Sequence, residues 1–195
     1  MKTKIQPALL LISMFVFSFN SLSQYDSALD LENDTTSLHA DTLLQLKKNT
    51  IFAEVGGNGF IYSINYDRLI DLTTKFKLST RIGVHYTHYV PFPHVRTHCI
   101  PAEVSGLFSI YKQKHFIELG TGLSYMSAYD QYTNRQFDLL ILTFRAGYRF
   151  QKPEGGMFVK VGFVPLYDMV NSNLDPDAPI HTWFFSGGLG LGYTF

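Results

Sequence analysis

Two kinds of side chain alternate along residues 183–195. Large apolar residues occupy every second position from Trp183 to Phe195 except Gly187, whereas the positions between them hold mostly glycine, serine or threonine. Successive side chains of a β-strand point to opposite faces, so this pattern predicts a strand with one large apolar face and one small or polar face. This alternation constrains the fold strongly, because neighbouring strands must also place apolar residues on one face and small or polar residues on the other.

The same period of two recurs upstream, where apolar residues again alternate with small, polar or charged ones. The alternating segments are residues 62–67, 77–86, 117–125, 140–150 and 159–163. After residue 48 we find no apolar run of the length that a membrane-spanning helix needs, about 20 residues. The sequence therefore predicts an all-β protein and excludes a bundle of transmembrane helices.

The composition excludes several functions. The 16 Lys and Arg residues equal the 16 Asp and Glu residues, so the chain lacks the positive charge that binding to nucleic-acid phosphates requires. The single cysteine excludes an internal disulfide framework and a cysteine-based zinc site. We therefore expect no nucleic-acid partner and no cofactor.

Residues 1–23 have the layout of a secretory signal peptide. Two early lysines precede an apolar run of about ten residues, which is too short to span a bilayer as a helix, and small residues follow. We predict cleavage between Ser23 and Gln24, which implies export from the cytoplasm. Residues 24–48 are rich in Asp, Ser, Thr and Asn and are predicted to form a polar N-terminal arm.

Two architectures accommodate strands with one apolar face, a secreted β-sandwich and a transmembrane β-barrel. In a sandwich the apolar face is buried in the core, whereas in a membrane barrel it faces lipid. Here the apolar faces carry Tyr, Phe and Trp at their ends, and the opposite faces combine glycine with charged residues. Aromatic girdles and a polar interior are typical of outer-membrane barrels, so we favour an antiparallel up-and-down barrel over residues 49–195.

Short and long connectors alternate along this region. The short ones are residues 71–75, 112–114 and 152–156, and the long ones are residues 90–97, 129–136 and 168–182. Outer-membrane barrels have short periplasmic turns, longer external loops and an even number of strands. Eight strands are therefore predicted, near residues 48–56, 59–70, 76–89, 98–111, 115–128, 136–151, 157–168 and 183–195.

The first hairpin and two prolines are the least regular parts of this assignment. Residues 56–59 contain Asn58-Gly59, a strong hairpin signal, and are predicted to form a tight external turn. The alternative is one long bent strand over residues 51–70, which would give seven strands. Pro101 and Pro165 fall inside predicted strands, and bulges or strand ends are expected there because proline donates no ladder hydrogen bond.

The parity of the strands predicts which charged residues point inward. The inward set contains four acids and four bases, namely Glu54, Asp67, Arg81, Glu103, Glu118, Arg145, Arg149 and Lys160. An eight-stranded barrel is just wide enough for side chains to fill, and desolvated charges must be paired. We predict an interior salt-bridge network that plugs the barrel; a selectivity filter or a set of catalytic acids is the alternative.

The C-terminal residues 188–195 resemble the C-terminal signature of bacterial outer-membrane β-barrels, which end in an aromatic residue. The matching positions are Leu189, Leu191, Tyr193 and Phe195. Residues 54–68 resemble the first hairpin of short, mostly uncharacterised barrel proteins of Bacteroidota-type, Gram-negative bacteria, which are similar to the OmpA membrane domain. The resemblance implies location in the outer membrane, recognition by the barrel-assembly machinery and contact with outer-membrane lipids.

Other residues suggest chemistry only weakly. His85, His88, His94 and His98 cluster near the second external loop, but no metal-binding spacing accompanies them. His85 with Glu103 or Glu118 is the candidate base and acid of a rim-active lipid A-modifying enzyme, a deacylase or acyltransferase. We assign no catalytic, cofactor-binding or metal-binding residue. The prediction is a monomeric outer-membrane barrel with a structural role or an interaction role of its loops; the enzyme and a narrow channel are alternatives.

Overall fold

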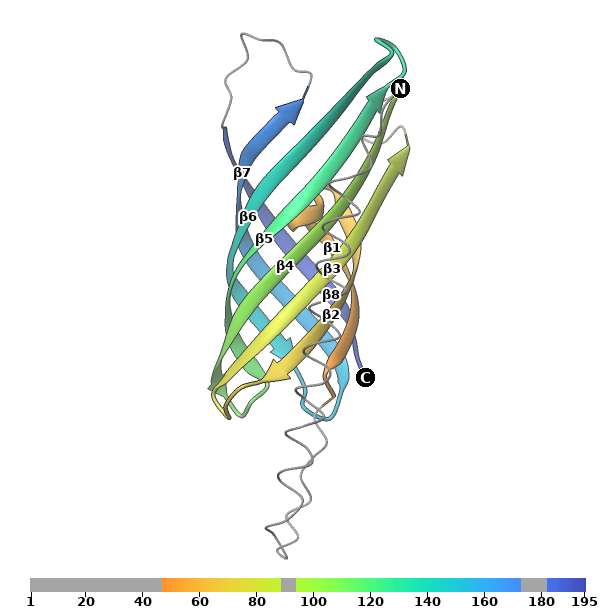
Figure 1. Ribbon diagram of the computed structural model, residues 1–195. Helices are drawn as coiled ribbons and strands as arrows, with labels where there is room; N and C mark the ends of the chain where they lie inside the picture. Colours follow the sequence, from red (N-terminus) through yellow and green to blue (C-terminus); the bar gives the residue numbers. More distant parts are fainter. Residues whose placement is uncertain (1–46, 89–93, 173–181) are drawn as a thin grey trace, which may run out of the picture. The chain divides into compact units, whose positions relative to one another are not determined.

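Eight antiparallel strands close into a barrel in the computed structural model, which describes residues 47–88, 94–172 and 182–195 (Figure 1). The eight-stranded, all-antiparallel fold predicted from the sequence is thus confirmed. The strands are β1 (Asn49–Gly56), β2 (Tyr62–Asp71), β3 (Phe76–His88), β4 (Val95–Tyr111), β5 (His115–Asp130), β6 (Arg135–Gln151), β7 (Gly156–Ser172) and β8 (Trp183–Thr194). A single 3-10 turn, η2 (Gly57–Gly59), joins β1 to β2. Among the described residues, no helix is long and apolar enough to cross a membrane.

The pairing of β1 with β8 closes the barrel. Their register runs from Thr50 opposite Thr194 to Gly56 opposite Gly188. The hydroxyls of Thr50 and Thr194 lie 2.9 Å apart and hydrogen-bond inside this seam. Closure removes the unpaired edges that an open sheet would present to other chains.

The connections define two ends of the barrel. Short turns join β2 to β3, β4 to β5 and β6 to β7 at one end, called here the short-turn end, where the C-terminus also lies (Figure 1). The β3–β4, β5–β6 and β7–β8 connections lie at the opposite, long-loop end. β5 and β6 extend to Asp130 and from Arg135, so the predicted long loop over residues 129–136 is wrong and a tight turn takes its place.

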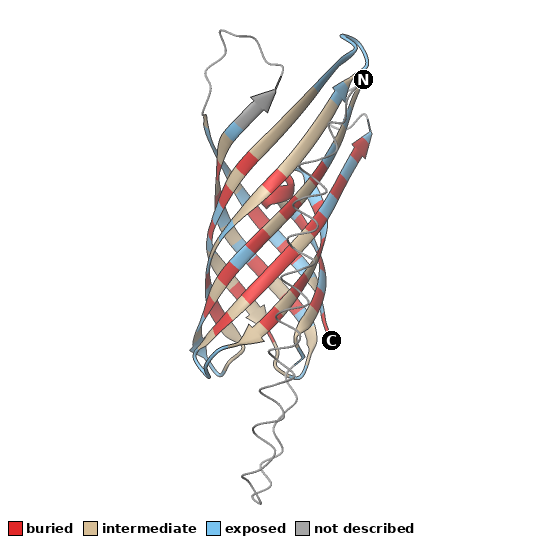
Figure 2. Ribbon diagram, viewed as in Figure 1, coloured by how far each residue is buried: buried red, intermediate tan, exposed pale blue. Residues whose placement is uncertain are grey.

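Burial alternates along the strands (Figure 2). In β2, for example, Ser63, Asn65 and Asp67 are buried, whereas Tyr62 and Ile64 on the opposite face are exposed. The small, polar and charged positions therefore point into the barrel and the large apolar positions point outward. Besides Cys99, eight apolar side chains of the described residues depart from this rule and fill the interior, namely Phe52, Leu69, Leu107, Phe116, Ile141, Phe158, Val164 and Leu166.

The two prolines do not end strands or create bulges, so that expectation is wrong. The β3–β4 register is unchanged on either side of Pro101, from Ile82 opposite Ala102 to His85 opposite Cys99. On its other side Pro101 pairs with β5, as Pro165 pairs with β8. Because proline lacks only the N–H group, the ladder is interrupted on one side of the strand and continues on the other.

A matched pair of glycines in β8 tests how tightly the seam is packed. A Cβ atom at Gly192 would lie 2.2 Å from the Ile51 carbonyl oxygen and 2.3 Å from Phe52 Cβ, whereas one at Gly187 would lie 4.0 Å from its nearest neighbour. We expect Gly192→Ala to lower the free energy of unfolding by about 1–3 kcal/mol, the usual cost of overpacking. Gly187→Ala, the control, should leave it within about 1 kcal/mol. Equilibrium denaturant titration of the refolded protein measures both, and equal effects would contradict the close packing of the seam.

Candidate functional site in the barrel interior

The eight charged residues assigned to the interior all lie there. Each is at most 3% exposed and projects from a strand position whose parity points inward. They come from seven of the eight strands, and β8 supplies none. The group consists of Glu54, Asp67, Arg81, Glu103, Glu118, Arg145, Arg149 and Lys160.

Arg145 and Arg81 bind the same two carboxylates in the half of the network nearer the long-loop end. The Arg145 guanidinium contacts Glu54 at 2.8 Å and Glu103 at 3.0 Å. Arg81 contacts Glu54 at 2.8 Å and Glu103 at 3.5 Å. Two cations and two carboxylates thus form a closed set, with each charge facing two opposite charges.

Arg149 and Lys160 organise the other half. Arg149 donates to both carboxylate oxygens of Asp67, at 3.2 and 2.9 Å, and contacts Glu118 at 2.9 Å. The Lys160 ammonium lies 3.0 Å from Glu118 and 3.7 Å from Glu103, so it joins the two halves. The Ser79 hydroxyl donates to Asp67 at 2.6 Å.

This arrangement compensates for the cost of burying eight charges. An isolated carboxylate or ammonium in a low-dielectric interior costs several kcal/mol, and only close opposite charges and hydrogen bonds offset that cost. Here four acids face four bases at hydrogen-bonding distance. The carboxylates are all engaged by cations, which suits a structural plug better than acid–base chemistry.

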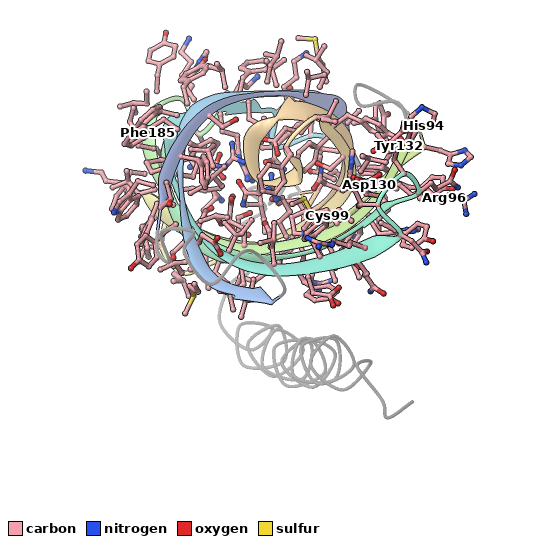
Figure 3. The ribbon with its side chains drawn as sticks, turned by 90° about the horizontal axis from the view of Figure 1, so that it is seen from above. His94, Arg96, Cys99, Asp130, Tyr132 and Phe185 are labelled. Carbon is pink, nitrogen blue, oxygen red and sulfur yellow. The ribbon has the colours of Figure 1, made fainter. Side chains whose placement is uncertain are left out.

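The turn η2 folds into the barrel and adds to the network. Figure 3 shows the β1–β2 connection inside the ring of strands, and Gly57, Asn58 and Gly59 are all buried. The tight external turn predicted for these residues is therefore wrong. The Asn58 amide donates to Glu103 at 2.6 Å and to Thr143 at 3.1 Å, while its oxygen accepts from Arg145 at 3.0 Å.

Glycine makes this inward fold possible. Gly56 and Gly57 have φ angles of 72° and 64°, which side chains other than glycine rarely adopt. A Cβ atom at Gly57 would also lie 2.7 to 2.9 Å from the Glu54 carboxylate. The Asn58 carbonyl then accepts a hydrogen bond from Ser124 at 3.0 Å, which anchors the turn to β5.

Asn58 is the site residue that the sequence analysis missed. Asn-Gly is a common hairpin dipeptide, so its local signal favours a surface turn. Its partners Glu103 and Arg145 lie 45 and 87 positions away in the sequence. The double glycine before Asn58 was the only local sign that the backbone takes an unusual path.

Aromatic rings cover the cations of the network. Phe52 and Phe158 are fully buried, with ring centroids 4.9 Å apart. Lys160 lies 5.4 Å from the Phe52 ring, and Arg149 lies 5.2 Å from the Phe158 ring. Such contacts attract the cations to the electron-rich ring faces and exclude water from their far side.

β8 leaves room for the long basic side chains. A Cβ atom at Gly188 would lie 2.8 Å from Glu54 and 3.2 Å from Arg145, and one at Gly190 would lie 2.8 Å from Lys160. Toward the short-turn end, a cavity of about 10 Å³ remains, which is room for about one water molecule. Lys47, Lys77 and Gln151 are among the residues that line it.

The histidines do not converge. His85 is buried and its Nδ1 lies 2.5 Å from the Tyr62 carbonyl, whereas His88 and His98 are exposed. Glu103 and Glu118 hydrogen-bond to residues other than His85. Neither carboxylate therefore orients the His85 ring as the predicted base. Cys99 is buried with its thiol 3.8 Å from the Asn58 carbonyl. In the described part of the chain, no three His, Cys, Asp or Glu side chains are grouped so as to hold a metal ion.

The remaining predicted positions separate into two groups. Leu189, Leu191 and Tyr193 of the C-terminal signature point outward and are exposed, as is Phe195. Ser23 and Gln24, the predicted cleavage position, lie outside the described residues, as does most of the polar arm.

A double-mutant cycle tests whether Lys160 and Glu118 act as a buried pair. Glu118→Gln leaves Lys160 and Arg149 with one carboxylate fewer, and we expect it to lower the free energy of unfolding by about 3–5 kcal/mol. Adding Lys160→Met removes the excess positive charge, so the double variant should recover part of that loss. Denaturant titration measures both, and strictly additive losses would contradict the pairing. As a control, Glu154→Gln breaks the exposed pair with Lys114 and should have no measurable effect.

Comparisons with known proteins support the fold. No protein-family model and no curated protein matches the sequence. Among solved structures, the N-terminal β-barrel domain of Pseudomonas aeruginosa OprF is similar, with a TM-score of 0.50 and 16% identity over 76% of this chain and 96% of that one. Neisserial surface protein A matches with a TM-score of 0.47 and 10% identity over 75% of this chain and 92% of its own. At such identity the likeness to the OprF domain shows a shared fold alone, that of a small outer-membrane-type β-barrel.

Proposed function

We propose that this chain is a small outer-membrane β-barrel with a plugged interior, and that it has a structural role or acts through contacts of its external loops. The observation that carries the proposal is the combination of an ion-paired, side-chain-filled interior with an apolar outer wall. A soluble barrel would place its polar face in water, whereas here that face is turned inward and buried.

The outer wall has the features that a bilayer requires. Ile64, Val161 and Leu191 are 50–57% exposed, and such residues cover the outward face. Toward the long-loop end, Trp183 packs against Phe144 and Tyr167 with ring centroids 6.1 and 4.9 Å apart. Aromatic rings gather at both membrane–water interfaces of barrels, with an apolar band between them. The short-turn end then corresponds to the periplasm, because outer-membrane barrels have their short turns there.

The interior favours a plug over a channel. Arg145 spans from β6 to Glu54 on β1 and Glu103 on β4, so its side chain crosses the lumen. Asn58 then covers this pair from the long-loop side. A conducting path would have to separate these charges, and the separation would leave buried ions unpaired.

The tip of the β5–β6 turn is built for contact with other molecules. Tyr132 is 86% exposed, and its backbone amide donates to Asp130 at 2.8 Å. The Thr133 hydroxyl also donates to Asp130 at 2.8 Å, so the turn is held in one shape. The His94 ring lies 6.0 Å from Tyr132. An exposed aromatic on a fixed turn gives contact area at low entropic cost, which suits loop-mediated interaction.

Planar-bilayer recording tests the plug. We expect the refolded wild-type protein to produce no resolved conductance steps. The double variant Glu103→Ala with Arg145→Ala removes two crossing side chains without changing the net charge, and small steps are expected from it. Glu154→Gln, at the exposed short-turn end, should remain silent. Regular steps from the wild-type protein would favour the narrow channel.

A lipid-facing arginine tests the membrane location. Val161→Arg places a charge on the outer wall, next to Lys160 of the interior network. We expect it to lower the free energy of unfolding from lipid vesicles by about 2–4 kcal/mol, because arginine is costly near the bilayer midplane. Tyr132→Arg, at the exposed turn, is the control and should change little. Migration in gels with and without heating reports the folded fraction of each variant. A wild-type protein that stays in the aqueous phase and whose migration ignores heating would contradict the proposal.

A further inference from the structure

Lysine residues gather at the short-turn end of the barrel. Every lysine of the described residues lies there except Lys160, which belongs to the interior network. Lys77 is only 3% exposed and points into the barrel, whereas the other six form what is called here the lysine rim, namely Lys47, Lys48, Lys75, Lys112, Lys114 and Lys152. They come from all three short turns and from the segment before β1, so they follow the barrel around its circumference.

Among the described residues, two carboxylate side chains lie at the short-turn end. Asp71 forms an ion pair with Lys77, and Glu154 pairs with Lys114 at 3.2 Å. A hydrogen bond from its own backbone amide, followed by the bond from Lys114, holds the pKa of Glu154 below its ordinary value, so this carboxylate is ionised at neutral pH. Among the described residues, these two acidic side chains cannot balance Lys77 and the six rim lysines, so the described part of this end carries a net positive charge.

Aromatic residues place the rim at the level of lipid headgroups. The Lys112 ammonium lies 5.0 Å from the centre of the Tyr111 ring. Lys75 directly precedes Phe76, whose ring centroid lies 4.9 Å from that of Phe108 on the outer wall. Aromatic side chains at the ends of membrane strands mark the boundary between hydrocarbon and headgroups. The lysines extend beyond this boundary on flexible stems, within reach of headgroup phosphates.

The opposite end differs in charge. The described residues there include Asp130, Asp138 and Asp168 with Arg96 and Arg135, and no lysine. The positive excess is therefore confined to one end. Solubility alone does not require different charges at the two ends of the barrel, because charge of either sign keeps a protein soluble.

We propose that the lysine rim binds the headgroups of anionic phospholipids in the membrane leaflet that contacts the short turns. The proposal rests on the proposed membrane location of the barrel. Lysines around the whole circumference can contact lipid on every side of the barrel, whereas a protein partner would contact a patch on only one side. Lysine also suits phosphate as a mobile point charge that needs no fixed pairing geometry. Basic residues beside a membrane span attract anionic lipids in this way.

Spin-labelled lipids test the proposal. The full mature chain is reconstituted in phosphatidylcholine vesicles that contain trace spin-labelled phosphatidylglycerol or phosphatidylcholine, and the motionally restricted fraction of each label is measured. We expect the wild-type protein to prefer phosphatidylglycerol about threefold or more, and the preference to weaken as salt screens the charges. A triple variant with one change in each short turn, Lys75→Gln, Lys112→Gln and Lys152→Gln, should lose most of the preference. Arg96→Gln with Arg135→Gln, at the opposite end, is the matched control and should retain it.

Three outcomes overturn the proposal. Equal restriction of both labels by the wild-type protein shows that the rim does not select anionic lipid. A triple variant that keeps the full preference assigns the selectivity to other residues. Binding of soluble polyglutamate through the same lysines, without any lipid preference, would identify a water-soluble polyanion as the partner. Motional restriction of the phosphatidylcholine label reports insertion of the barrel into the bilayer. If that label is not restricted, the proposed membrane location is overturned. If both labels are restricted equally, only the proposal for the lysine rim is overturned.

Discussion

The requirement that every interior charge be paired governs this barrel. Eight strands enclose a space that side chains fill, so charges inside it are largely removed from water. The hydrogen-bond ladder joins each strand only to its two neighbours. Several of the ion pairs join strands that are not neighbours, because Arg145 on β6 reaches Glu54 on β1 and Arg149 on β6 reaches Asp67 on β2. The network thus ties opposite walls together, which the ladder cannot do.

The neighbouring features follow from this network. β8 contributes no charge, and instead its glycines at 188 and 190 give space to the Arg145 and Lys160 side chains. The turn η2 folds inward because Asn58 supplies both a donor to Glu103 and an acceptor to Arg145. Protein atoms satisfy most of the polar groups of the network, although Arg81 Nε and Arg145 Nη1 are buried without a hydrogen-bond partner. The plug is therefore part of the wall and is held by side chains from several strands.

Sequence periodicity predicted the strands and the inward parity because both depend on local geometry. Successive side chains of a strand point to opposite faces, so the face on which Glu54 and Lys160 lie can be predicted without knowing the fold. The same parity also marks Phe52 and Phe158 as inward, although their apolar character suggested the lipid face. The inward turn was beyond this reasoning, because the partners of Asn58 are distant in sequence and an Asn-Gly pair favours an exposed hairpin. We expected a bulge or a strand end at Pro101, but β4 pairs with β3 on one side and with β5 on the other. The N–H group that proline lacks would serve only one of these two pairings.

A net charge of zero conceals two separate distributions. Across the barrel, the interior acids and bases cancel within the network, and this cancellation is a condition of folding. Along the barrel, the described lysines of the short-turn end outnumber the described acids there, and ion pairs of the rim lysines at the surface contribute little to stability. Surface charges at the two ends are not needed for folding, so they can be adapted to the surroundings of each end. The interior network therefore fills the barrel with its own paired side chains, and the lipid interaction that we propose depends on the short-turn end alone.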